Sequence, residues 1–398
     1  MFSSLTNLVP CAVLIAVTLS ACGGGTDQTQ TSASAAPRLA TGTSSSCGAG
    51  TGSLALLAGG RANSARPELP ALAQTLLVDA AAARATISLY RVDGRPTRAW
   101  SGHFALEAPT QAALRQKAED YAQQVTGLFA QLTAKAPEAD PLTALSLAAR
   151  DTAAGGTIVL VDSGLQTVAP LDFTSGDLLA AAPADVVADL RAHKLLPDLT
   201  GRTVVLAGLG DTAEPQTALD NAYRSNLIAL WTAIADAGGA CVDLDERPLQ
   251  GQPADGLPTV AQVKVPTAPI VEACGVTILP DSSHVGFKPD TAEFRDPAGA
   301  RQALTALATA AKRPDTRTTL EGTTATAGGV TSRVALSTKR AEAVRTVLVA
   351  LGVPADDITA RGVGTASRYH VNDLDGNGNL IPALAVTNRT VVATLTCQ

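Results

Sequence analysis

Aromatic and histidine side chains are scarce in this chain of 398 residues. Aromatic residues make up 3% of the sequence, while hydrophobic residues as a class make up 46%, so any core is built from alanine, valine, leucine and isoleucine. The histidines are scattered and none stands in a recognisable catalytic motif: His103, His193, His284 and His370. The cysteines lack the C-x-x-C spacing of zinc sites. The sequence therefore offers neither a Ser-His-Asp arrangement nor a zinc signature.

An excess of positive charge is also absent. The chain has 30 Lys+Arg against 36 Asp+Glu, for a net charge of −6. Because nucleic-acid binding needs a basic surface and the sequence has no basic cluster, we expect no nucleic-acid partner. Long apolar runs are missing as well. The run at residues 8–19 contains Pro10 and falls short of the roughly 20 residues that a membrane-spanning helix needs.

The N-terminal segment has the features of an export signal. Its apolar run ends in Leu19-Ser20-Ala21-Cys22-Gly23, which resembles the cleavage site of a bacterial lipoprotein. The resemblance implies that residues 1–21 are a signal peptide and that Cys22 carries lipid, which anchors the protein to a membrane bilayer in the cell envelope. An ordinary secretory signal cut elsewhere is the alternative. Residues 22–47 are small and polar, and we expect a flexible tether.

Residues 48–245 alternate segments of strand and helix character. Strands are expected at 53–58, 85–92, 157–161, 202–207 and 240–244, and helices at 70–83, 110–134, 140–152, 183–193 and 216–237. A continuous apolar run such as 157–161 is typical of a parallel strand that is covered on both faces. The pattern predicts an α/β domain with a doubly wound, mostly parallel sheet. The order and spacing of these strands and helices resemble the von Willebrand factor A fold, and residues 140–145 and 159–164 carry the resemblance.

That resemblance implies a metal site with D-x-S-x-S after the first strand, a later threonine, and an aspartate after the fourth strand. Here the first strand leads into residues 59–64, which contain Arg61 and no carboxylate. Thr143 matches the threonine, and Asp162 stands one residue from the expected register. Because magnesium needs a near-octahedral set of oxygen ligands, we expect an incomplete metal site, and a domain that binds an unknown protein partner.

Polar residues gather where the predicted parallel strands end. They are Arg61, Asn63, Ser64, Asp93, Asp162, Ser163, Asp211 and Thr212. Ligands of open α/β sheets bind at this carboxyl edge. The segment Gly208-Leu209-Gly210-Asp211-Thr212-Ala213 also matches the dinucleotide pattern G-x-G-x-x-A. A hydrolase or nucleotide-binding enzyme that uses this edge is therefore the alternative to our main expectation, a protein without enzymatic activity.

The last part of the chain carries a second set of motifs. Residues 246–270 are rich in proline and predict a linker, which leaves a second domain at 271–398. There Leu336-Ser337-Thr338-Lys339-Arg340-Ala341 begins a helix with Arg340 on its more polar side and a stop at Gly352. Residues 285–294, 298–311, 318–322, 358–364 and 388–392 follow the order of an opening strand and turn, first helix, second strand, third strand and last strand. Together these landmarks resemble the OmpA-like domain family and imply a smaller α/β domain that docks on peptidoglycan or a related envelope ligand.

The resemblance also implies which residues bind. In the family the arginine that Arg340 matches holds the carboxylate of a diaminopimelate side chain, and a planar guanidinium suits that task. Thr324 also matches the family motif. Ala325 stands where the family has an aspartate that receives the ligand ammonium, which weakens the expected binding of ordinary peptidoglycan. Arg333 and Thr390 stand where the family has an asparagine and a second arginine.

Four cysteines remain after Cys11 and Cys22, and four cysteines allow three pairings. Because Cys47 and Cys241 bracket the first domain while Cys274 and Cys397 bracket the second, we predict those two disulfides. Each closes a long loop, which is worth about 4–5 kcal/mol in the chain-entropy model. The alternative is four free thiols, which an oxidising compartment disfavours.

Residues 373–380 resemble the first half of an EF-hand loop. Asp373, Asp375 and Asn377 stand at alternate positions and Gly378 follows, whereas Leu384 occupies the place of the bidentate glutamate. We therefore expect either an incomplete calcium site or a hydrophilic insertion before the last strand. No other cofactor is expected. A calcium-responsive adhesion module is a further alternative for the function.

Overall fold

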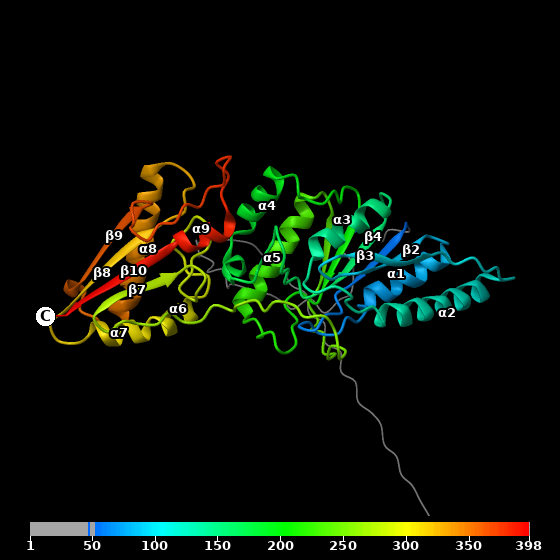
Figure 1. The fold of residues 1–398 in the computed structure, drawn as a ribbon, viewed down its shortest axis with the longest axis horizontal. Helices are drawn as coiled ribbons and strands as arrows, with labels where there is room; N and C mark the ends of the chain where they lie inside the picture. The colour runs from blue at the N-terminus through cyan, green and yellow to red at the C-terminus, as the bar shows by residue number, and fades with distance from the viewer. Residues whose placement is uncertain (1–46, 48–51, 398) are drawn as a thin grey trace, which may run out of the picture. The chain divides into compact units, whose positions relative to one another are not determined.

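The computed structural model describes residue 47 and residues 52–397, which belong to one compact unit with two sheets (Figure 1). The predicted signal peptide, the lipidation site at Cys22 and most of the tether lie outside these residues. In the part that the structure describes, no helix is both long and apolar enough to cross a membrane. The domain boundaries expected from the sequence stay a prediction.

The first sheet has six strands in the order β3-β2-β1-β4-β5-β6. All neighbours are parallel except β2 and β3, which are antiparallel. The strands are β1 (Leu54–Ala58), β2 (Ile87–Arg91), β3 (Thr97–Gly102), β4 (Thr157–Val161), β5 (Thr203–Ala207) and β6 (Cys241–Asp245). The helices are α1 (Ala71–Ala82), α2 (Gln111–Ala130), α3 (Pro141–Asp151), η1 (Asp177–Ala180), α4 (Pro183–Ala192) and α5 (Asn221–Ala237). This mostly parallel α/β sheet confirms the predicted fold class.

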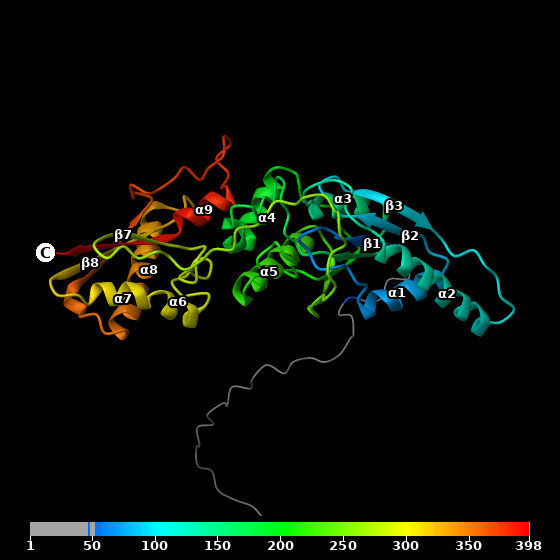
Figure 2. The same ribbon diagram turned by 60° about the horizontal axis from the view of Figure 1, so that its bottom comes forward.

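Helices cover both faces of this sheet. Neighbouring residues of a strand point to opposite faces, and both Leu56 and Leu57 of β1 are fully buried. Leu56 packs in one apolar cluster with side chains of α1 and α2, which lie side by side in Figures 1 and 2. Leu57 packs in the other cluster, with side chains of α3, α4 and α5. Burial on both faces explains why these strands read as continuous apolar runs.

Side-chain caps determine where several helices begin. Asp140 accepts a hydrogen bond from the Thr143 N–H at 3.0 Å, and Pro141 follows it in the first turn of α3. Asp220 accepts from the N–H groups of Ala222 and Tyr223, each at 2.9 Å. Helix α5 therefore begins at residue 221, and the predicted start at residue 216 was wrong.

The second sheet has four strands in the order β7-β10-β8-β9. Strand β10 pairs antiparallel with β7 and β8, and β8 pairs parallel with β9. The strands are β7 (Gly275–Pro280), β8 (Thr316–Thr323), β9 (Ile358–Gly364) and β10 (Thr390–Cys397). The helices are α6 (Pro297–Ala303), α7 (Thr305–Ala311), α8 (Val330–Ala350), η2 (Ala355–Asp357) and α9 (Pro382–Asn388). Helices α7 and α8 pack with the sheet in one apolar cluster, so this is the smaller α/β sheet that was predicted.

Several predicted elements of this second region need correction. The first strand is β7, whereas residues 285–294 form a loop closed by an isolated bridge between Phe287 and Phe294. The single helix predicted at 298–311 is two short helices, α6 and α7. Helix α8 begins at residue 330 and ends at residue 350. Gly352 follows it with φ of +94°, the left-handed conformation expected at its stop.

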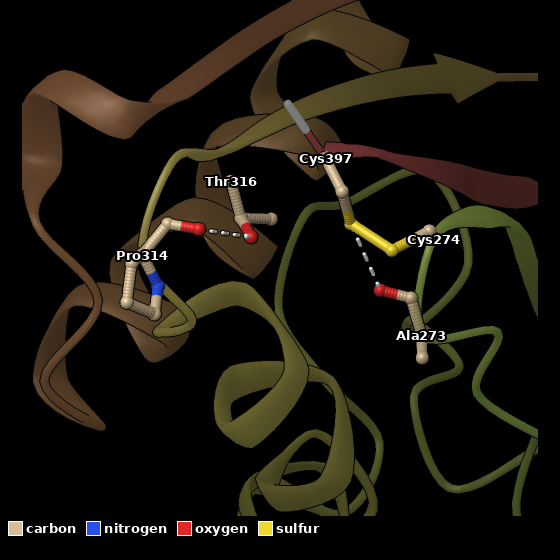
Figure 3. Close-up of a disulfide and its surroundings, with 5 residues drawn as sticks. All are labelled: Ala273, Cys274, Pro314, Thr316 and Cys397. Atoms are coloured by element: carbon tan, nitrogen blue, oxygen red, sulfur yellow. Dashed lines mark hydrogen bonds between the residues drawn. A yellow bond between two sulfur atoms is a disulfide. The ribbon is translucent and has the colours of Figure 1, made fainter.

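Two disulfides close the two regions. Cys47 is bonded to Cys241 at the start of β6, and Cys274 is bonded to Cys397 at the end of β10. These are the two pairings predicted from the sequence. Figure 3 shows that the second bridge joins the residue before β7 to the last residue of β10, and that Cys397 Sγ also contacts the carbonyl oxygen of Ala273 at 3.5 Å. The bridge therefore holds together neighbouring strands of the sheet.

Candidate functional site

Two glycines allow α8 to lie close against the second sheet. A Cβ at Gly322 of β8 would lie 2.0 Å from the carbonyl oxygen of Ser337, and one at Gly362 of β9 would lie 2.2 Å from the Thr338 nitrogen. Neither position can therefore hold a side chain while α8 stays in place. The Ser337 hydroxyl also accepts a hydrogen bond from the Gly364 N–H at 3.1 Å. These contacts fix the helix one turn before Arg340.

Arg340 is buried, with an exposed fraction of 2%. Its Nε donates to the carbonyl oxygen of Thr291 at 2.9 Å, and its guanidinium lies 5.2 Å from the centroid of the Phe287 ring. The loop at residues 285–294 thus covers the side chain, although the sequence pattern places it on the more polar side of the helix. Burial lowers the pKa of Arg340, while Asp281 and Asp290 act in the opposite direction.

A cavity of about 910 Å³ lies beside Arg340. It is lined by residues 290–293, by the segment after β8, by α8 and by Arg389. Thr324, Ala325 and Arg340 all line it, so the structure brings together the residues that the sequence selected for ligand binding. A cavity of this size accommodates a small molecule or the end of a peptide side chain.

The lining of the cavity is mainly basic. Arg333, Lys339, Arg340 and Arg389 supply positive charge, and Asp290 and Glu293 supply negative charge. Glu293 forms a salt bridge with Lys288 at 3.0 Å, and Arg389 forms one with Asp185 of α4. Within the described part of the chain, the other four have no salt bridge. Neither Lys339 nor Arg389 was predicted as a binding residue. Lys339 lies within the L-S-x-x-R motif, but the motif leaves its position unspecified.

Thr324, directly after β8, and Arg333 of α8 line this cavity, and each has one buried polar atom without a partner. The Thr324 N–H donates to the carbonyl oxygen of Gly364 at 3.1 Å, which holds the backbone in place. The hydroxyl of Thr324 is buried and has no partner among the residues that the structure describes, and the same is true of Arg333 Nε. A buried polar group without a partner is costly, but both atoms are shielded from solvent, so a ligand in the cavity reaches them only when a neighbouring side chain moves.

Asp373, in the segment after β9, holds the loop that follows β8. Asp373 is fully buried, and its carboxylate accepts from the Thr326 N–H at 2.9 Å. Burial by itself would raise the pKa of Asp373, but hydrogen bonds from Thr326 and Asn388 outweigh it and keep the pKa below its usual range. Asp373 therefore helps to hold the loop that carries Thr324 and Ala325.

The expected calcium ligands Asp373 and Asp375 form hydrogen bonds with different parts of the protein. Asp375 accepts from the side chain of Asn379 at 3.0 Å and from the N–H groups of Asn379 and Asn377, which lower its pKa to about 2. Asp373 instead points to Thr326. The described residues contain no group of three His, Cys, Asp or Glu side chains that could hold a metal ion. Calcium binding at Asp373, Asp375 and Asn377 stays a prediction.

The polar residues at the carboxyl edge of the first sheet bind mainly to one another. Arg61 and Asp162 form a salt bridge with both side chains fully buried, and Arg61 Nη2 donates to Ser163 Oγ at 3.1 Å. Asp211 pairs with Arg224, and α5 begins well after the Gly208–Gly210 turn rather than directly from it. Asp93 accepts from three backbone N–H groups of the following loops. The edge is thus occupied largely by internal contacts.

Comparison with known proteins places the second region in a family. Residues 286–377 match the OmpA family model. Comparison with curated proteins gives no match. Similar solved structures include the peptidoglycan-associated lipoprotein from Burkholderia pseudomallei, at 22% identity over 30% of this chain and 89% of that one, with a TM-score of 0.24.

Two more similar structures each cover 33% of the chain. The cell wall anchor of the T6SS from Pseudomonas aeruginosa is 20% identical over 33% of this chain and 89% of its own, with a TM-score of 0.26. The periplasmic domain of Helicobacter pylori MotB is 16% identical over 33% and 81%, with a TM-score of 0.26. The motifs around Arg340 lie within the residues that match the family model, and residues 286–377 are therefore an OmpA family domain.

Proposed function

We propose that this protein is a non-enzymatic lipoprotein of the cell envelope that docks on peptidoglycan through the cavity beside Arg340. The observation that carries the proposal is the guanidinium of Arg340, which is held by Thr291 and Phe287 at the wall of the cavity. A fixed guanidinium with unused N–H groups is suited to bind a carboxylate through two parallel hydrogen bonds. Thr324 also lines the cavity, and its buried hydroxyl supplies a further hydrogen bond when a side-chain movement uncovers it.

The family match supports this proposal. OmpA family domains are expected to bind the diaminopimelate of peptidoglycan, and two similar structures bear the names peptidoglycan-associated lipoprotein and cell wall anchor. The two disulfides agree with an exported protein, because such bonds form in oxidising compartments. Cys22 is the proposed site of the lipid that anchors the chain to a membrane.

For the first sheet we propose a von Willebrand A-like domain that binds a protein partner. The strand order β3-β2-β1-β4-β5-β6, with an antiparallel strand at one edge, supports this assignment. At the edge where that fold has its metal, the Arg61 guanidinium already supplies a positive charge to Asp162. We therefore propose that partner binding by this domain does not need a metal ion.

Co-sedimentation with purified peptidoglycan sacculi tests the wall-binding proposal. We expect Arg340→Ala to lower retention of the protein about tenfold or more, because hydrogen bonds between charged groups are worth about 1.5–3 kcal/mol. Arg345→Ala is the matched control: Arg345 lies on the same helix, pairs with Glu342 and does not line the cavity. Because Arg340 is buried, thermal unfolding must first show that its variant is folded. Equal retention of wild type and Arg340→Ala would refute the proposal.

A further inference from the structure

The chemical groups that face the cavity suit an anion better than a zwitterion. Of the charged residues that line it, Glu293 and Arg389 are neutralised by Lys288 and Asp185. In the described part of the chain, Arg333, Lys339 and Arg340 are left to face the single acid Asp290. The cavity therefore has about two positive charges in excess.

The polar groups of the residues that line the cavity point to the same conclusion. Arg333 Nε can only donate a hydrogen bond, and so can the guanidinium of Arg340. The buried Thr324 hydroxyl can donate or accept, and all three side chains line the cavity. Ala325 follows Thr324 and presents a methyl group to the same space. The wall beside Arg340 thus offers N–H and O–H groups, and Asp290 is the one carboxylate among the described lining residues that has no salt bridge.

Asp290 is the one acid that remains, and its position limits what it can do. It is exposed on the loop that covers Arg340, and its charge already acts on that guanidinium. An exposed carboxylate is screened by water and attracts a ligand ammonium only weakly.

We propose that the cavity binds carboxylates whose neighbouring amine is acylated or absent, and that it gains nothing from a free ammonium. This inference rests on the proposed function and names the part of the wall that the site selects. A diaminopimelate residue whose side-chain amine has formed an amide cross-link keeps its carboxylate and has lost its ammonium. The site then accepts cross-linked stem peptides as well as free ones.

Two small dicarboxylic acids test this inference directly. Pimelate has the carbon chain and both carboxylates of diaminopimelate but neither amine. We expect wild-type protein to bind pimelate at least as tightly as diaminopimelate, as measured by the shifts of backbone amide signals of residues 324–340 in NMR titrations. Ala325→Asp restores a carboxylate to the cavity wall and should move the ratio of the two dissociation constants about tenfold in favour of diaminopimelate.

Two control variants test whether a carboxylate must lie at the cavity wall beside Arg340 to change the ratio of the two dissociation constants. Thr346→Asp adds a carboxylate on an exposed turn of α8 outside the cavity, and we expect it to leave the ratio unchanged. Asp290→Asn should also leave the ratio unchanged. If it instead weakens diaminopimelate alone, Asp290 reads the ammonium and the inference is wrong. The wild-type ratio decides the question even if Ala325→Asp does not fold.

Sacculus retention distinguishes failure of the inference from failure of the proposed function. Tighter binding of diaminopimelate by wild type overturns the inference, while retention on sacculi leaves wall binding intact. Binding of neither acid by a protein that still sediments with sacculi also overturns the inference, because the wall is then bound elsewhere. If neither acid binds and sacculi do not retain the protein, the proposed function fails and the inference fails with it.

Discussion

Replacing Arg61 with methionine should destabilise the first sheet by about 3–5 kcal/mol, because it leaves the charge of Asp162 buried without its partner. Both side chains are fully buried. Arg61 also donates to Ser163 Oγ at 3.1 Å and to the carbonyl oxygen of Val92 at 3.4 Å. Without the guanidinium, Asp162 keeps the Gly164 N–H at 2.7 Å, which does not replace an opposite charge. Methionine fills a similar volume, so the loss reports mainly on charge.

Urea denaturation followed by tryptophan fluorescence measures this loss. Trp231 is fully buried and donates to the carbonyl oxygen of Gly164 at 2.9 Å, so it reports on the structure next to the ion pair. The chain has two tryptophans, and a Trp100→Phe background isolates the signal. Adding Asp162→Asn to Arg61→Met should cost less than the sum of the two single changes, by about 0.5–3 kcal/mol. A loss below about 1 kcal/mol for Arg61→Met, or strict additivity of the two changes, would refute the account of the pair.

Two further predictions concern contacts outside the cavity. The double change Cys274→Ser and Cys397→Ser opens a long loop and should lower the free energy of unfolding of the second sheet by about 4–5 kcal/mol; an unchanged denaturation midpoint would contradict this. The backbone carbonyl of Asp189 and the carboxylates of Asp189 and Asp375 raise the pKa of His193, so Asp375→Asn should lower it towards about 6.5. The contact between His193 and Asp375 therefore contributes its full stability below about pH 6.5, and this stability is lost as pH rises through the raised pKa of His193. NMR titration of the His193 ring checks this, and identical pKa values in both proteins would exclude the contact.

The buried strands are the elements that the sequence predicts best. Strand β4 occupies residues 157–161, as the continuous apolar run indicates, because burial on both faces leaves a strong local signal. Strand β3 (TRAWSG) was missed, since its side chains are mostly exposed and only its pairing with β2 defines it. The start of α5 was misplaced because the cap at Asp220 decides it, and periodicity does not see caps.

The motif places Arg340 correctly on α8 and Thr324 correctly after β8, yet it does not predict how the cavity is completed. Helical periodicity assigns an arginine to the outer face, whereas the loop at residues 285–294 covers Arg340 and places the ring of Phe287 against its guanidinium. The loop that covers it has little regular structure and leaves no periodic signal.

The net charge of the cavity depends on residues outside the L-S-x-x-R motif. Glu293 and Arg389 both line it, and each is neutralised by a residue that is not among the lining residues, Lys288 for the first and Asp185 for the second. A change at Asp185 would therefore add a positive charge to the cavity without touching its wall. The family motif includes residues that fix how α8 packs against the sheet, while the net charge of the cavity depends on salt bridges that the motif does not contain.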